Sequence, residues 1–130
     1  MCKVRVLLAD DHEGILASVR TVLDEEFEVV GAVRNGRDAL AEVQRLAPDV
    51  LVMDICMPVM DGLRAASLLD SNRSTKVVFL TLHEDREFVA AAFSAGASGY
   101  VLKSKMATDL VPAIRAALQG CRYISQFPQP

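Results

Sequence analysis

Short apolar runs alternate along the chain with segments in which apolar residues recur every three or four positions. Runs of the first kind are typical of β-strands buried on both faces, and segments of the second kind are typical of amphipathic helices. The pattern predicts strands over residues 4–9, 27–33, 50–53, 76–81 and 99–102. A helical stripe follows each strand, and these stripes include Ile15, Ala39, Leu63, Phe88 and Leu110.

Strict alternation of strands and helices predicts the architecture. We expect one α/β domain of the doubly wound (βα)5 type, flavodoxin-like, with a five-stranded parallel sheet and helices on both faces. In such a sheet the carboxyl ends of all strands share one edge, and ligands bind there.

Two segments fit this pattern less well. Pro112 falls inside the last helical stripe, although proline is tolerated only in the first turn of a helix. We therefore expect this helix to start late, near Thr108 or Asp109, or to have a distorted first turn. Residues 121–130 lose the helical period, so we assign residues 1–120 to the domain and residues 121–130 to the start of a linker or a loose tail.

The composition of the chain excludes several classes of protein. The chain has 130 residues, of which 52% are hydrophobic and 24% charged, as in globular domains. It has no apolar run long enough to span a membrane and no signal peptide, so we expect a cytoplasmic protein. A net charge of −3 with dispersed Lys and Arg argues against direct binding to nucleic acid. Cys2, Cys56 and Cys121 lack disulfide or metal-ligand spacing, and we expect reduced thiols.

Polar residues stand where the predicted strands end. Asp10 and Asp11 follow the first strand, Asp54 the third and Lys103 the fifth, and Thr81 ends the fourth. Each of them alone has an ordinary structural explanation, such as a helix cap or a solvated surface charge. Five such groups at matching strand ends, however, should converge on one edge of the sheet.

Converging carboxylates indicate a particular chemistry. Three of them would repel one another without a cation, and Mg²⁺ commonly binds a few carboxylates together with phosphate and water. Asp54 is then a candidate nucleophile, since carboxylates can form acyl phosphates. Lys103 and Thr81 could contact the oxygens of the transferred phosphoryl group.

Four motifs stand at the predicted strand ends: Ala-Asp-Asp-His at 9–12, Met-Asp-Ile-Cys-Met-Pro-Val-Met-Asp-Gly at 53–62, Leu-Thr at 80–81 and Ala-Gly-Ala-Ser-Gly-Tyr-Val-Leu-Lys at 95–103. With these motifs the chain closely resembles the receiver domain of a bacterial two-component response regulator over nearly its whole length. Residues 27–31, 95–103 and 123–125 are further similar to the NarL/LuxR-type branch of that family.

This resemblance implies a CheY-like fold and a phosphorylation site. Asp54 would accept a phosphoryl group from a sensor histidine kinase, as a phosphoacceptor and not a turnover enzyme. Mg²⁺ or Mn²⁺ would be bound by Asp11, Asp54 and the backbone carbonyl of Cys56, with Asp10 acting nearby or through water.

The resemblance also implies a switch. Thr81 and Lys103 would contact the phosphoryl group, and Tyr100 would swing inward when Thr81 closes on it. The altered surface around the fourth helix, fifth strand and fifth helix would favour a homodimer or control an effector domain, with DNA bound only through a domain outside this chain. Residues at the positions of Cys56 and His83 would modulate the rate of phosphoryl loss.

Other assignments fit less well or remain open. A phosphatase of the haloacid dehalogenase type needs a second Asp two residues after its nucleophile, and Cys56 stands at that position. A flavodoxin-type electron carrier would need a hydroxyl- and glycine-rich phosphate loop where Asp10 and Asp11 stand. A degenerate receiver would lack some of the acidic residues or Lys103. A stand-alone receiver that acts through protein contacts, without a DNA-binding effector, remains the alternative to a transcription regulator.

Overall fold

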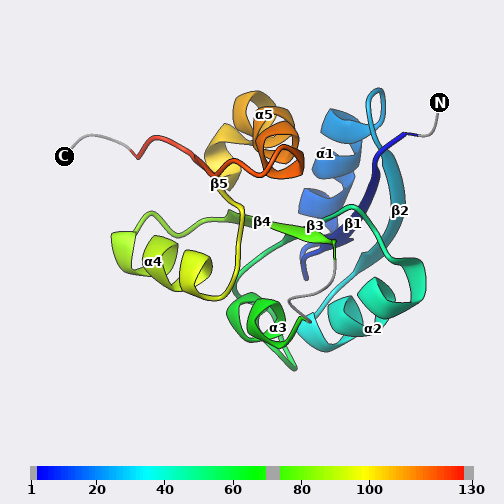
Figure 1. Ribbon diagram of the computed structural model, residues 1–130, viewed down its shortest axis with the longest axis horizontal. Coiled ribbons are helices and arrows are strands. Elements are labelled where there is room, and N and C mark those ends of the chain that lie inside the picture. Colours follow the sequence, from blue (N-terminus) through cyan, green and yellow to red (C-terminus); the bar gives the residue numbers. More distant parts are fainter. Residues whose placement is uncertain (1–2, 70–73, 128–130) are drawn as a thin grey trace.

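The computed structural model describes residues 3–69 and 74–127. Its helices and strands alternate as the sequence predicts (Figure 1). The strands are β1 (Arg5–Ala9), β2 (Glu28–Val33), β3 (Val50–Met53), β4 (Lys76–Thr81), β5 (Gly99–Leu102) and β6 (Tyr123–Ile124). The helices are α1 (Glu13–Leu23), α2 (Gly36–Leu46), α3 (Gly62–Leu68), α4 (Arg86–Ser94) and α5 (Met106–Leu118), and a 3₁₀ turn, η1 (Lys103–Lys105), precedes α5.

The strands form one parallel sheet in the order β2-β1-β3-β4-β5-β6. The chain passes from β1 to β2 on one side and then returns to place β3 on the other side of β1. Doubly wound sheets bind their ligands at this change of direction, beside the carboxyl ends of β1 and β3. Ala9 pairs with Met53 at the carboxyl ends of β1 and β3. The residues that follow them, Asp10 and Asp54, are therefore brought side by side by the register of the sheet.

Helices cover both faces of the sheet, so the core has two layers. Alternate strand residues such as Leu8 and Val52 pack with α1 and α5, while their neighbours Leu7 and Met53 pack with α2, α3 and α4. Figure 1 shows α1 and α5 above the sheet and the other three helices below it. The strands β1, β3, β4 and β5 are thus buried on both faces, which fixes the direction of the polar residues at their ends, while the edge strand β2 is only partly buried.

The turn between β3 and α3 holds the backbone close to Asp54. Asp61 caps α3 by accepting a hydrogen bond from the Arg64 N–H at 2.7 Å. The Gly62 N–H donates to the Ile55 carbonyl at 2.7 Å, and a Cβ at Gly62 would lie only 2.0 Å from the Asp54 carbonyl oxygen. Glycine is therefore the residue that this close approach requires.

Two local features differ from the expectations. The last helix begins at Met106, so the late start near Thr108 or Asp109 is wrong, and Pro112 lies beyond the first turn on an exposed face. The sheet also has a sixth strand that the sequence does not predict, because β6 is only two residues long. Its pairing is completed by the Ser125 N–H, which donates to the Tyr100 carbonyl at 2.9 Å, and Ser125 is buried. Tyr123, Ile124 and Ser125 are thus held against the domain.

Candidate functional site

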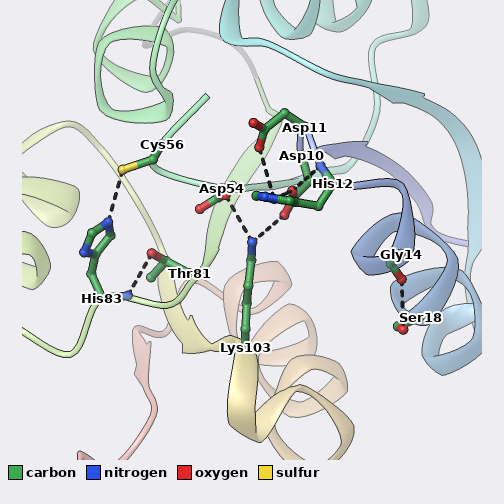
Figure 2. A network of polar contacts seen from close by, with 10 residues as sticks. All are labelled: Asp10, Asp11, His12, Gly14, Ser18, Asp54, Cys56, Thr81, His83 and Lys103. Carbon is green, nitrogen blue, oxygen red and sulfur yellow. Dashed lines mark hydrogen bonds and ion pairs between the residues drawn. The ribbon is translucent and has the colours of Figure 1, made fainter. Parts of the chain in front are cut away.

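Asp10, Asp54 and Lys103 form a buried ion-pair cluster at the carboxyl edge of the sheet. The Lys103 ammonium reaches back from η1 and lies 2.9 Å from Asp10 Oδ2 and 3.1 Å from Asp54 Oδ2. The three side chains are only 4–6% exposed. Figure 2 shows the Lys103 amine between the two carboxylates, so one cation that follows β5 directly contacts the acids that follow β1 and β3.

Burial and charge act against each other in this cluster. Burial raises the pKa of Asp54, and the nearby Lys103 charge only partly offsets that effect. Burial alone would lower the pKa of Lys103, but its contacts with Asp10 and Asp54 outweigh burial and raise the pKa. Lys103 therefore stays charged, and Asp54 is a carboxylate with few solvent contacts whose negative charge is only partly compensated.

The acidic cluster continues to Asp11 and His12. Single ligand atoms of Asp10, Asp11, His12 and Asp54 lie within 4.8 Å of one another. Asp10 Oδ2 and Asp11 Oδ1 are buried without a hydrogen-bond partner, although Lys103 pairs with the first of them. Buried carboxylate oxygens of this kind fit a hard divalent cation, so Asp10, Asp11 and Asp54 could bind one.

A second group of side chains lies on the side of Asp54 that faces away from Asp11 and His12 in Figure 2, and it consists of Thr81, His83 and Cys56. Thr81 is fully buried, and its hydroxyl accepts a hydrogen bond from the His83 N–H at 3.2 Å. Cys56 Sγ contacts His83 Nε2 at 3.1 Å, and the His83 ring stacks on Phe88 with a centroid separation of 4.2 Å. The two residues expected to modulate the rate of phosphoryl loss therefore touch each other.

Tyr100 lies inside the domain behind this group. Its side chain is fully buried, and its hydroxyl donates to the His83 carbonyl at 2.8 Å. Burial, followed by the negative charges of Asp85 and Asp54, raises the pKa of Tyr100 to about 12. The Phe127 ring packs edge-on against the Tyr100 ring at 6.2 Å, so Tyr100 connects His83 with the segment that follows β6.

The structure brings together most of the residues singled out from the sequence, and it adds His12. The sequence places His12 only within a motif and assigns it no contact. Its imidazole nevertheless lies 3.2 Å from both Asp10 Oδ1 and Asp11 Oδ1. Cys56 and Cys121 are free and exposed, while Cys2 lies outside the described residues.

Comparison with known proteins agrees with this arrangement. The family model for the response regulator receiver domain matches residues 6–115. The transcriptional regulatory protein DegU of Brevibacillus brevis is 36% identical over 125 residues, which is 94% of this chain and 53% of DegU. Response regulator UvrY of Escherichia coli K12 is 37% identical over 125 residues, or 94% of this chain and 57% of UvrY. The chain thus spans a little over half the length of these relatives.

Solved structures show the same similarity. The signal receiver domain of NarL from Mycobacterium tuberculosis superposes with a TM-score of 0.87 at 32% identity, covering 92% of this chain and 99% of that domain. None of the helices among residues 3–69 and 74–127 is both long and apolar enough to cross a membrane.

Proposed function

Since the chain belongs to the family of response regulator receiver domains, of the NarL/LuxR type, we propose that it is a switch in which Asp54 accepts a phosphoryl group from a sensor histidine kinase. The observation that carries this proposal is the buried Asp54 carboxylate, held by Lys103 beside Asp10. A signalling partner of this kind places the chain in the cytoplasm. The chain acts as a phosphoacceptor and not as a turnover enzyme.

The contacts of Asp54 suggest how the transfer proceeds. Lys103 Nζ holds Asp54 Oδ2 at 3.1 Å, which leaves the other carboxylate oxygen as the nucleophile. That oxygen forms a bond to phosphorus as the phosphorus–nitrogen bond of the kinase phosphohistidine breaks, and the leaving imidazole takes a proton from solvent. The Lys103 ammonium stabilises the negative charge of the transferred group because it is already in place.

A divalent ion, Mg²⁺ or Mn²⁺, belongs to the same proposal. Asp11, Asp54 and the backbone carbonyl of Cys56 would hold it, with Asp10 nearby or bound through water. When bound, it neutralises negative charge on the phosphoryl oxygens. The buried Asp11 Oδ1, which has no hydrogen-bond partner, supports this assignment.

We propose that Thr81 and Tyr100 couple phosphorylation of Asp54 to a change in the shape of the α4–β5–α5 surface. A phosphoryl group on Asp54 would attract the Thr81 hydroxyl away from the His83 N–H. His83 also accepts the Tyr100 hydroxyl through its carbonyl, so its movement would reach Tyr100 and the α4–β5–α5 surface. This surface would then favour a homodimer or release an effector domain.

The output is proposed to be transcription regulation. The relatives named above are longer than this chain, and one is called a transcriptional regulatory protein. DNA would be contacted by a DNA-binding domain and not by these 130 residues, whose net charge is −3. Action as a stand-alone receiver through protein contacts is the alternative.

Cys56 and His83 are proposed to set the lifetime of the phosphoryl group. The two side chains touch at 3.1 Å near Asp54 (Figure 2), and we expect the loss of this contact to give water easier access to the phosphoryl group. Phosphoryl loss should therefore be several-fold faster in Cys56→Ala than in wild type, while the exposed Cys121→Ala should match wild type. Equal decay rates in all three proteins, followed by intact mass, would show that this contact has no kinetic role.

Acetyl phosphate tests the acceptor without the kinase. Wild-type protein incubated with acetyl phosphate and Mg²⁺ should gain the mass of one phosphoryl group, and an excess of EDTA should prevent the gain. Asp54→Asn is the matched variant because it keeps the shape of the side chain and removes the nucleophile. Equal labelling of both proteins would place the acceptor elsewhere.

A further inference from the structure

His12 occupies an unusual position for a histidine. It is the residue before α1, where Ser, Thr, Asp or Asn normally accept a hydrogen bond from the first turn of the helix. The His12 side chain makes no such bond. Figure 2 shows that its ring instead turns back toward the carboxylates of Asp10, Asp11 and Asp54.

The contacts of the His12 ring leave one acceptor without a partner. Nδ1 lies 3.2 Å from Asp10 Oδ1 and 3.2 Å from Asp11 Oδ1, but only the contact with Asp10 has hydrogen-bond geometry. Asp10 Oδ1 also accepts the backbone N–H of His12 at 2.9 Å, so Asp10 Oδ1 has a hydrogen bond without the ring, while Asp11 Oδ1 stays buried without one. A cation could contact the nitrogen and the oxygen together.

The spacing of these atoms is that of neighbouring metal ligands. Metal bonds of 2.0–2.1 Å in octahedral geometry place adjacent ligands about 3.0 Å apart and opposite ligands about 4.2 Å apart. The 3.2 Å separations are close to the first value. The overall span of 4.8 Å among the four residues needs a contraction of about half an ångström.

From this geometry we propose that His12 Nδ1 is a further ligand of the divalent ion bound at Asp11 and Asp54. This inference rests on the proposed function, because it concerns the same metal site. It adds a nitrogen donor to a set of oxygen donors. Imidazole suits first-row transition ions, whereas Mg²⁺ strongly prefers oxygen, so His12 makes the site bind Mn²⁺ in preference to Mg²⁺.

Two variants separate this role from a structural one. His12→Asn removes the nitrogen donor and places a favourable capping residue before α1, so the fold should be retained. His83→Asn is the matched control because the chain has two histidines in all. At pH 8, His12→Asn should weaken Mn²⁺ binding at least about tenfold and Mg²⁺ binding less than about threefold, as measured by calorimetry, while His83→Asn should change neither.

Pulsed electron paramagnetic resonance of bound Mn²⁺ gives a second readout, which does not depend on activity. Nitrogen coupling from a histidine ring should be present in the wild type and in His83→Asn and absent in His12→Asn. Bound Mn²⁺ without histidine coupling in the wild type, or equal Mn²⁺ affinity in wild type and His12→Asn, would overturn the inference. Phosphorylation of Asp54, which the mass measurement tests separately, would stand in either case.

Discussion

Replacing Lys103 by Met should destabilise the domain more than any ordinary surface substitution. The ammonium contacts Asp10 at 2.9 Å and Asp54 at 3.1 Å, and all three side chains are 4–6% exposed. Methionine keeps most of the side-chain volume but leaves two neighbouring carboxylates without this cation. Removing one partner from a buried ion pair typically costs 3–5 kcal/mol. Because the cluster lies at the edge of the sheet, we expect Lys103→Met to lower the free energy of unfolding by about 3 kcal/mol, the lower end of this range.

Urea unfolding in EDTA measures this cost without a metal ion. Lys103→Met/Asp10→Asn should regain at least about 1 kcal/mol over Lys103→Met, because it removes the repulsion between the two acids. Lys105→Met serves as the control, since the Lys105 ammonium donates to the Gln126 carbonyl through an exposed hydrogen bond, and this substitution should cost less than about 1 kcal/mol. A Lys103→Met protein within 1 kcal/mol of wild type, or a double variant no more stable than the single one, would refute the ion-pair argument.

Two further predictions concern the backbone near Asp54 and the segment at the edge of the sheet. Gly62→Ala should lower the free energy of unfolding in urea by about 2–3 kcal/mol, because the added Cβ would meet the Asp54 carbonyl. Gly14→Ala is the control, since an added Cβ there has nothing within 4 Å, and it should stabilise α1 by up to about 1 kcal/mol. Similar stabilities of the two variants would show that the turn at Gly62 is looser than described. Burial opposes ionisation of Asp109, but hydrogen bonds from Ser125 and Thr108 outweigh burial and lower its pKa. The stabilisation by Asp109 should therefore be complete above its ordinary value near 3.8 and be lost as the pH falls through the lowered value. The protection of the Ser125 N–H, which is its hydrogen-exchange rate compared with that of an unfolded chain at the same pH, should fall over that acid range in wild type but not in Asp109→Asn, and the same profile in both proteins would exclude this anchor.

The sequence predicts the fold well because its apolar pattern is unambiguous. Strands buried on both faces, such as β3, contain only apolar residues, and the helices between them keep a clear period. The register of parallel strands then brings Asp10, Asp54 and Lys103 to one edge without any knowledge of side-chain conformation.

Features that depend on single side chains could not be predicted in this way. The strand β6 is two residues long, and it is secured by the Ser125 hydroxyl, which donates to Asp109 at 2.7 Å. Such a short segment has no period to detect. The orientation of His12 depends on a side-chain rotation, although a histidine at a helix N-cap after two aspartates is an unusual enough signal to look for. Pro112 shows that tertiary packing of α5 outweighs the preference of proline for the first turn.

Locating the phosphoryl group on the chain tests the central claim most directly. Hydroxylamine displaces phosphate from an acyl phosphate and leaves a hydroxamate on the side chain that carried it. After acetyl phosphate and Mg²⁺, peptide mass spectrometry should find the hydroxamate at Asp54 in the wild type and at no residue in Asp54→Asn. A hydroxamate at Asp10 or Asp11, or none in a wild-type protein that has gained phosphoryl mass, would contradict the assignment of Asp54 as the phosphoacceptor.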